Sequence, residues 1–390
     1  MNRAASLSRP ILMPPTFGST SSTLDPFRTI AVLMSGGVDS SVTAWLLQQQ
    51  GWQVVGITMK LPEAQGCRVP RPCCGADAAM VCHHLNLPHY FIDAQEVFRD
   101  QIIKPFREAY LSGRTPSPCV DCNSWLKFGV VWDVIREELG IEYLATGHYA
   151  RLSLAGRSPK LGRGVDAARD QSYFLHGIQS TRLLFLRIPL CAYTKEQVRI
   201  IAVDLGLPVA KKPDSMELCF AGEEDYRHLL TDTPSRPGPV VDPEGRMIGN
   251  HKGIHHYTIG QRRGLGIANE QPLYVLRILP ETNTIIAGHR DALLTHDIHA
   301  SGINVLQPDK LQEGAVLQGK IRSIGRSQVC RVIRWDSVQL HVQFNEPVFA
   351  PAPGQRLVLY DTEDYLVAGG EMEASELVVN ITSEKQVSMK

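Results

Sequence analysis

The segment Ser35-Gly36-Gly37-Val38-Asp39-Ser40 follows the first long apolar run of the chain and precedes a helical pattern. A glycine-rich turn between a strand and a helix presents backbone amides and the positive end of the helix dipole, which together bind anions. Gly36 and Gly37 allow close approach of a phosphate because they have no side chain, and Asp39 and Ser40 supply capping and hydroxyl groups. The segment has neither the Gly-Lys-Ser/Thr ending of the Walker loop nor the Gly-x-Gly-x-x-Gly of dinucleotide folds. It predicts a phosphate-binding loop of another kind.

Two segments carry cysteines that could do chemistry. Cys119 and Cys122 lie in the segment 117–123, which we expect to be a loop that opens a helix, and Cys219 lies in the segment 214–220. The positive helix end should lower the pKa of a thiol there and favour the thiolate. The same residues also suit packed, unreactive thiols or a metal held by Cys119 and Cys122. A closed four-thiolate zinc site, however, lacks its second Cys-x-x-Cys pair.

Composition indicates which class of protein the chain belongs to, but it points to no particular partner. The chain has 390 residues, 43% of them hydrophobic and 21% charged, and its 40 basic and 40 acidic residues give a formal net charge of zero. No apolar run reaches the roughly 18 residues that a membrane helix needs. The nine cysteines are odd in number and no export signal precedes them, so we expect thiols in a reducing compartment rather than a disulfide scaffold.

Alternating strands and helices predict the fold of the first half. We expect strands at 29–34, 53–59, 90–92 and 141–146, and helices at 78–85, 95–110, 124–139 and 194–205. The helix at 95–110 should bend near Pro105, and Thr194 with Gln197 should form a capping box. This order is typical of an α/β domain with a doubly wound parallel sheet.

The second half has a different character and predicts two smaller domains. Residues 1–28 are rich in Ser, Thr and Pro, and we expect a disordered extension there, with a transit peptide as the alternative. The expected α/β domain covers 29–220 with both cysteine segments, and a small linking domain covers 221–295. Short alternating segments at 316–324, 328–333, 338–344, 356–360 and 365–369 predict an antiparallel β-barrel over 296–384, with a turn at 361–364 and a tail at 385–390.

The loop resembles the signature of the PP-loop ATP pyrophosphatases. Together with the cysteine segments, it makes the chain similar to the bacterial tRNA-specific 2-thiouridylases over nearly all residues after 28. Six further motifs fit in order and spacing: Thr146-Gly147-His148-Tyr149, 169–174, 210–215, 257–266, Glu346-Pro347 and 353–355.

The resemblance implies a reaction and its participants. ATP, with Mg²⁺ as counterion, adenylates the C2 oxygen of the wobble uridine in tRNAs for Lys, Glu and Gln, and a persulfide sulfur replaces that oxygen. Cys219 would carry the persulfide, and Cys122 would be the nucleophile that forms a transient disulfide with it. One thiol then carries activated sulfur and the other resolves the pair by exchange. A cysteine desulfurase or a sulfur-relay protein would donate the persulfide, in the cytoplasm, and no side-chain metal site is expected.

The resemblance also implies which residues contact the substrates. Nucleotide contacts are expected from Leu33, Met34, Ser35, Gly36, Gly37, Val38, Asp39, Ser40, Met59 and Gly147, and tRNA contacts from Arg169, Asp170, Gln171, Arg322 and Arg326.

The chain departs from the family pattern at two places. Some members have an Asp where this chain has Cys119, which leaves the general acid or base open, with Asp121 as a nearby candidate. Cys119, Cys122 and Cys219 could instead hold an iron–sulfur cluster. The barrel of some members uses an Arg-Tyr pair on tRNA, and here the corresponding stretch reads Arg-Ser-Ile-Gly-Arg at 322–326.

Other interpretations stay open at this point. Lys211 and Lys212 suit either pyrophosphate binding or a solvated pair. Cys67, Cys73 and Cys74 could bind zinc with His83 or His84. Another PP-loop adenylating ligase would need an ammonia source, for which the sequence shows no segment, and a non-catalytic RNA- or metal-binding protein would form no AMP.

Overall fold

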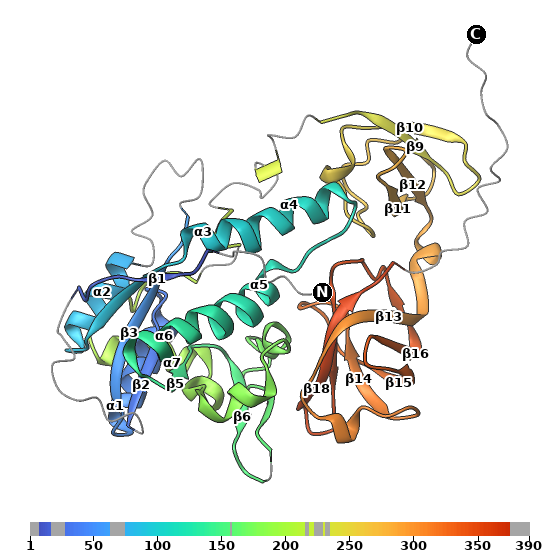
Figure 1. Ribbon diagram of the computed structural model, residues 1–390. Coiled ribbons are helices and arrows are strands. Elements are labelled where there is room, and N and C mark those ends of the chain that lie inside the picture. Colours follow the sequence, from blue (N-terminus) through green and yellow to red (C-terminus); the bar gives the residue numbers. More distant parts are fainter. Residues whose placement is uncertain are drawn as a thin grey trace.

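The computed structural model describes residues 8–16, 28–62, 75–156, 158–214, 218–221, 229–230 and 235–374. Figure 1 shows an α/β part formed by the first half of the chain, a small sheet formed by β9 to β12, and a barrel formed by the C-terminal strands. The expectation of a parallel-sheet domain, a linking domain and a C-terminal antiparallel barrel is confirmed.

The first sheet has six strands in the order β1-β4-β3-β2-β5-β8. All of its strands except β1 are parallel to one another. Their bounds are β2 (Thr29–Leu33), β3 (Gln53–Lys60), β4 (His89–Asp93), β5 (Tyr143–Ala145) and β8 (Leu186–Arg187). Apolar residues on both faces of β2 are buried, with Ala31 in one core cluster and Ile30 in the other. The uninterrupted apolar run at 29–34 is therefore that of a strand covered on both faces.

One part of the expected N-terminal extension is ordered. β1 (Ile11–Leu12) pairs antiparallel with β4 at the edge of the sheet. The amide of Met13 donates to the carbonyl of Phe91 at 2.8 Å, and the amide of Thr16 donates to that of His89 at 2.9 Å. The expectation of disorder throughout 1–28 is therefore wrong for residues 8–16, because an unpaired sheet edge offers backbone partners that composition does not reveal.

The helices cover both faces of the sheet (Figure 1). They are α1 (Val38–Gln49), α2 (Gly75–His84), α3 (Gln95–Phe98), α4 (Lys104–Leu111), α5 (Pro118–Asp121), α6 (Trp132–Leu139) and α7 (Lys195–Asp204). The predicted capping box is confirmed, since the amide of Gln197 donates to Thr194 Oγ1 at 3.3 Å and the amide of Thr194 to Gln197 Oε1 at 2.8 Å. Lys195, the first residue of α7, thereby has a fixed place.

Two helices contain π-helical stretches. Arg99–Ile103 joins α3 to α4, directly before Pro105, where we expected a bend. Cys122–Val131 joins α5 to α6, so this helix begins at Pro118, earlier than the predicted start at residue 124. Pro118 suits the first turn because its missing N–H has no helical partner there. Cys119 and Cys122 consequently lie within the helix rather than in a loop before it.

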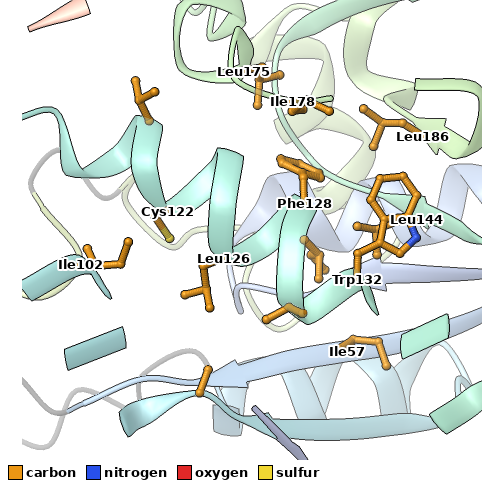
Figure 2. Packing of buried hydrophobic residues seen from close by; sticks show 14 of the residues in the cluster. Ile57, Ile102, Cys122, Leu126, Phe128, Trp132, Leu144, Leu175, Ile178 and Leu186 are labelled. Carbon is orange, nitrogen blue, oxygen red and sulfur yellow. The ribbon is translucent and has the colours of Figure 1, made fainter. Parts of the chain in front are cut away.

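This helix packs its apolar side into the larger core cluster. Leu126, Phe128 and Trp132 are buried there with Cys122. Figure 2 shows these four side chains along one helix above the sheet that carries Ile57. Cys122 is thus part of the hydrophobic core as well as part of a cysteine pair.

The linking domain is a four-stranded sheet in the order β10-β9-β12-β11. Its strands are β9 (Gly238–Val241), β10 (Met247–His251), β11 (Tyr274–Leu279) and β12 (Thr284–Gly288). Only β9 and β12 are parallel.

The C-terminal strands close into a barrel in the order β13-β16-β15-β14-β17-β18. Their bounds are β13 (Leu294–Val305), β14 (Val316–Lys320), β15 (Gln328–Trp335), β16 (Gln339–Phe349), β17 (Arg356–Tyr360) and β18 (Leu366–Met372). β14 ends at Lys320, so 321–324 belong to a loop and not to the predicted strand. The turn at 361–364 is confirmed, with Asp364 at φ 64°.

The barrel packs directly against the α/β domain. A hairpin of β6 (Ala150–Ser153) and β7 (Lys160–Arg163) reaches it, and the amide of Arg163 donates to the carbonyl of Asp364 at 3.0 Å. Tyr173 donates its hydroxyl to the carbonyl of Arg356 at 2.9 Å. Asn304 donates to the carbonyl of His176 at 2.6 Å. Buried polar bonds of this kind fix one relative placement, because breaking them leaves buried groups unpaired.

In the part of the chain that the structure describes, no helix has the length and apolarity needed to cross a membrane.

Gly369 of β18 gives a test of this interface. A Cβ added there would lie 2.4 Å from His176 Cδ2, and the His176 side chain is only 3% exposed. We expect Gly369→Ala to destabilise the protein by about 1–3 kcal/mol, as overpacking typically does, measured as a lower melting temperature. In a His176→Ala background the same substitution should cost much less. An equal loss in both backgrounds would show that the ring is not what fills the space.

Candidate active site

The phosphate loop joins β2 to α1 as predicted. Gly36 has φ 68°, which favours glycine, and Gly37 is the N-cap of the 12-residue helix α1 with no side-chain cap. The Ser40 hydroxyl stays inside the loop, accepting from the amide of Ser35 at 3.2 Å and donating to the carbonyl of Gly37 at 3.1 Å. The amides at the start of α1 are therefore available to an anion.

Asp39 forms an ion pair and does not cap the helix, which corrects its expected capping role. Its carboxylate accepts from Lys195 Nζ at 2.8 and 2.7 Å and from the Tyr149 hydroxyl at 2.7 Å. Lys195 also pairs with Asp214 at 2.8 Å, and Asp214 pairs with Arg199 at 2.6 Å. Burial alone would raise the pKa of Asp214, but the hydrogen bond and charge of Lys195 hold it below its usual value. The cluster thus pairs two carboxylates, those of Asp39 and Asp214, with the Lys195 amine beside the loop.

Gly147 lies directly against the first turn of α1. A Cβ added there would be 2.8 Å from the amide nitrogen of Ser40 and 2.9 Å from the carbonyl carbon of Asp39. Only glycine fits this approach of two backbones. The next residue, His148, lines a separate cavity that also contains the cysteines. The segment Gly147-His148 thus separates the phosphate loop from the thiols.

The other predicted nucleotide contacts occupy the strand ends beside the loop. Leu33 and Met34 are buried, and Met59 is partly buried near the end of β3. Lys212 donates to the carbonyl of Gly36 at 3.0 Å and pairs with Asp77, while Lys211 is exposed. Of the two lysines, Lys212 is therefore the one that the structure brings to the loop.

The site fits a nucleotide polyphosphate better than it fits a metal held by the protein. Asp39, Asp77 and Asp214 each have a lysine partner. Within the described stretches of chain, no three His, Cys, Asp or Glu side chains are grouped to hold a metal ion. Mg²⁺ is commonly held by phosphates and waters with only one or two carboxylates, so a Mg²⁺ that arrives with the nucleotide would not need a preformed protein site.

The thiols line a cavity of about 990 Å³ between the α/β domain and the barrel. Cys119, Cys122 and Cys219 all contribute to its wall. Cys119 and Cys219 are exposed, whereas Cys122 is 6% exposed and lies deeper. The sequence segments that carry these cysteines, about a hundred residues apart, therefore meet in one place.

The thiols are less acidic than the sequence predicts. Burial raises the pKa of Cys122, and it raises the pKa of Cys119 to about 11, helped by the nearby Cys219. The expected lowering by the helix end is wrong because desolvation of a buried thiolate outweighs a helix dipole. Lys127 acts in the opposite direction and lowers the pKa of both thiols.

Lys127 and His148 form the polar part of the same cavity. Lys127 Nζ donates to Asn123 Oδ1 at 3.0 Å, and Asn123 donates to the carbonyl of Phe174 at 3.2 Å. Burial, together with the charge of Lys127, lowers the pKa of His148 to about 3. The imidazole is therefore neutral at physiological pH, and Lys127 is the cation facing the thiols.

The predicted tRNA segment also reaches this cavity, where Arg169, Asp170 and Gln171 line the wall. Asp170 accepts from the amide and hydroxyl of Ser172 at 3.1 and 3.0 Å, which fixes the start of a helical turn. Gln171 accepts from the amide of Tyr149 at 3.0 Å. Arg169 is exposed and pairs with Asp214 at 3.2 Å. Two of the three side chains thus also hold the local backbone.

The barrel contributes different residues from those predicted. Arg322 donates to the carbonyls of Phe349 and Ala350 and lines a smaller pocket beside the linking domain. Arg326 is exposed. Ser323 and Ile324, which lie between them, line the thiol cavity. The structure therefore brings the predicted loop to the site but turns Arg322 away from it.

Asp121 lies on the far side of the cysteine helix. Its carboxylate pairs with Arg356 of the barrel, and both residues line a second cavity that contains none of the three thiols. This placement does not suit Asp121 as the acid or base of the thiol cavity.

Two lysines at the site are not predicted by the sequence analysis. Lys127 lies five residues after Cys122 on the same helix, and this spacing was the available signal. Lys195 follows the predicted N-cap, but nothing local indicates its bond to Asp39. Cys67, Cys73 and Cys74 of the considered zinc site lie outside the described residues.

The charge of Lys127 can be tested by alkylation of the thiols. Removing it raises the pKa of Cys119 and Cys122, so at a pH below those values the thiolate fraction falls. We expect Lys127→Met to slow iodoacetamide labelling of Cys119 at pH 9 about threefold or more, and Lys127→Arg to preserve it. Labelling is followed by peptide mass spectrometry, with Cys191 as an internal control. Unchanged labelling in Lys127→Met would contradict the assignment.

Comparison with known proteins gives three successive matches. Residues 28–223 match the tRNA methyl transferase HUP domain, residues 227–289 the tRNA methyl transferase PRC-barrel domain, and residues 295–371 the aminomethyltransferase beta-barrel domain.

Relatives match over almost their whole length. The chain is 41% identical over 358 residues to the tRNA-specific 2-thiouridylase MnmA of Carboxydothermus hydrogenoformans, which covers 89% of this chain and 98% of that protein. It is 39% identical over 356 residues to tRNA-specific 2-thiouridylase MnmA 2 of Thermoanaerobacter sp. strain X514, which covers 88% of this chain and 97% of that protein. The expected resemblance is thereby confirmed, and the chain belongs to the family of tRNA-specific 2-thiouridylases, which are tRNA-uridine 2-sulfurtransferases.

Proposed function

We propose that the protein catalyses ATP-dependent 2-thiolation of the wobble uridine in tRNAs of the Lys, Glu and Gln types, releasing AMP and pyrophosphate. The supporting observation is the cavity in which Cys119, Cys122 and Cys219 meet the segment 169–171, next to the phosphate loop. A base that enters this cavity meets thiols on one wall. The loop lies behind Gly147 on the other side of the same short segment.

In this proposal the loop binds the phosphates of ATP. The backbone amides at the start of α1, which has no side-chain cap, would bind the negatively charged phosphates, and the two glycines would allow their close approach. Lys212 adds a cation at the loop. Mg²⁺ would arrive with ATP and neutralise part of the charge of its phosphates. The uracil C2 oxygen attacks the α-phosphate and displaces pyrophosphate. The oxygen is a poor leaving group as a carbonyl, and as an adenylate it leaves as AMP.

Cys219 then delivers sulfur. The terminal sulfur of its persulfide forms the C–S bond at C2 while the C–O bond to AMP breaks. The Cys122 thiolate attacks Cys219 Sγ, so the S–S bond to the nucleoside breaks and the thione is released. A Cys122–Cys219 disulfide remains, and an external thiol must reduce it. Because burial keeps Cys122 protonated, the exchange depends on a nearby cation, and Lys127 lies in the same cavity.

The exposed position of Cys219 suits loading by another protein. A cysteine desulfurase or a sulfur-relay protein would transfer its persulfide sulfur to this thiol before tRNA covers the cavity. For tRNA, we propose contacts from Arg169, Asp170 and Gln171 at the cavity and from Arg326 on the barrel. Arg322, which is engaged with backbone carbonyls, supports its loop instead.

The two thiols give the most direct test. We expect Cys219→Ser and Cys122→Ser each to abolish 2-thiouridine formation while tRNA affinity stays within about twofold, because neither change removes a charge that binds phosphate. Thiolation is measured by nucleoside mass spectrometry with ATP, unmodified tRNA and a persulfide donor. Cys191→Ser, at a thiol outside the cavity, should keep full activity. Normal thiolation in either cavity variant would overturn its assigned role.

The iron–sulfur form of the same function has less support. Cys119 lines the cavity with Cys122 and Cys219, and a cluster on these three thiolates would leave one iron open for sulfide, but among the described residues no three His, Cys, Asp or Glu side chains are grouped closely enough to hold a metal ion. Anaerobic reconstitution with iron and sulfide separates the two forms. A cluster absorbance that Cys119→Ser removes, together with loss of thiolation in that variant, would support the cluster. Thiolation by iron-free Cys119→Ser would support the persulfide.

Another adenylating ligase of the same superfamily would behave differently. It would release pyrophosphate with a substrate other than tRNA. Pyrophosphate release that depends on a tRNA with an unmodified wobble uridine supports the proposal, and release that ignores tRNA contradicts it.

A further inference from the structure

The barrel loop 321–327 places an apolar side chain at the thiol cavity. Ile324 is 90% exposed, more than any other large apolar side chain recorded as exposed in the described chain, and it nevertheless contributes to the cavity wall with Ser323. Isolated exposed apolar side chains are common. An exposed apolar side chain at the entrance of a reaction cavity, however, can contact a substrate that enters the cavity.

The loop is held at both ends. Arg322 donates to the carbonyls of Phe349 and Ala350, and Ser327 accepts from Arg163 of the α/β domain at 2.8 Å. Gly325, at φ 139°, turns the backbone just after Ile324. The exposed side chain is therefore carried on a loop that is fastened to both domains.

The reaction requires the base to leave its stack. While Cys219 holds the nucleoside through its sulfur, it must be within reach of Cys122, which is 6% exposed at the wall of the cavity. C2 therefore has to enter the cavity, which a uridine stacked within an anticodon loop cannot do. Enzymes that act on a base extrude it, at the cost of lost stacking. Apolar side chains such as Ile, Leu or Met recover part of that loss by filling the gap between the neighbouring bases.

We propose that Ile324 occupies the place left in the anticodon stack when the wobble uridine enters the thiol cavity. This inference rests on the proposed function. It assigns to the barrel loop, which reads Arg-Ser-Ile-Gly-Arg at 322–326, a wedge that contacts the neighbouring bases. Arg326, two residues further along the same loop and exposed, is placed for the adjoining phosphate.

The test uses tRNA in which 2-aminopurine stands next to the wobble uridine. The fluorescence of 2-aminopurine rises when the uridine stacked on it leaves. With wild-type protein and ATP we expect a rise on binding. In Ile324→Ala the fluorescence change should be smaller and kcat for thiolation about tenfold lower, with tRNA affinity nearly unchanged. Ile324→Met should restore both, because it fills similar space. Val338→Ala, at a 67% exposed side chain on another part of the barrel, is the matched control.

A substrate with abasic sites on both sides of the wobble uridine makes the test specific. Its uridine is already unstacked, so wild type and Ile324→Ala should thiolate it at similar rates. Equal fluorescence and equal kcat for the two proteins on normal tRNA would overturn the wedge. So would an Ile324→Ala defect confined to tRNA affinity, which would make Ile324 a simple contact. If wild-type protein thiolates no tRNA, the proposed function itself fails.

Discussion

The contact between Gly147 and the first turn of α1 is the constraint on which the rest of the site depends. Two backbones approach so closely there that a Cβ would lie 2.8 Å from the amide nitrogen of Ser40. Because β5 leads into this contact and His148 follows it, the end of the sheet places the phosphate loop on one side and the thiol cavity on the other. In the proposed reaction, oxygen activation and sulfur delivery occur at the same carbon, so the two sites would have to lie near each other.

The charged residues differ between the two sides of the segment Gly147-His148. Beside the loop, Lys195 is buried between Asp39 and Asp214, and buried charges persist only when they are paired in this way. The amides of α1 and Lys212 are thus left to attract phosphate. In the thiol cavity, burial makes thiolates costly and keeps His148 neutral. Lys127 is the group there that favours negative charge on sulfur. In the proposed function, the loop side of the segment would bind phosphate, and the cavity side would form a thiolate with the help of Lys127.

The parts predicted well from the sequence are those with local causes. The glycine loop, the capping box of Thr194 and the apolar run of β2 each depend on neighbours within a few residues. The errors have distant causes. Residues 11–12 are ordered by a sheet edge formed about 80 residues later. Cys122 was expected to be acidic from its helix, but the core that surrounds it raises its pKa. The contact of Arg322 with tRNA stays a prediction, but its bonds to the carbonyls of Phe349 and Ala350 likewise come from residues that its local sequence does not indicate.

The barrel contacts the helix that carries Cys119 and Cys122 directly, and this contact fixes the position of the barrel relative to the thiols. Arg356 of β17 pairs with Asp121, which lies between Cys119 and Cys122, and it also pairs with Glu371 of β18. Arg356 is 9% exposed, so its charge is held in place by these two carboxylates. In the proposed function, a tRNA bound at the barrel would be aligned with the thiols through this ion network, in which Arg356 is buried. Since misplacement by about 1 Å can cost two orders of magnitude in rate, a direct link between the barrel and the helix of Cys119 and Cys122 suits the proposed delivery of sulfur.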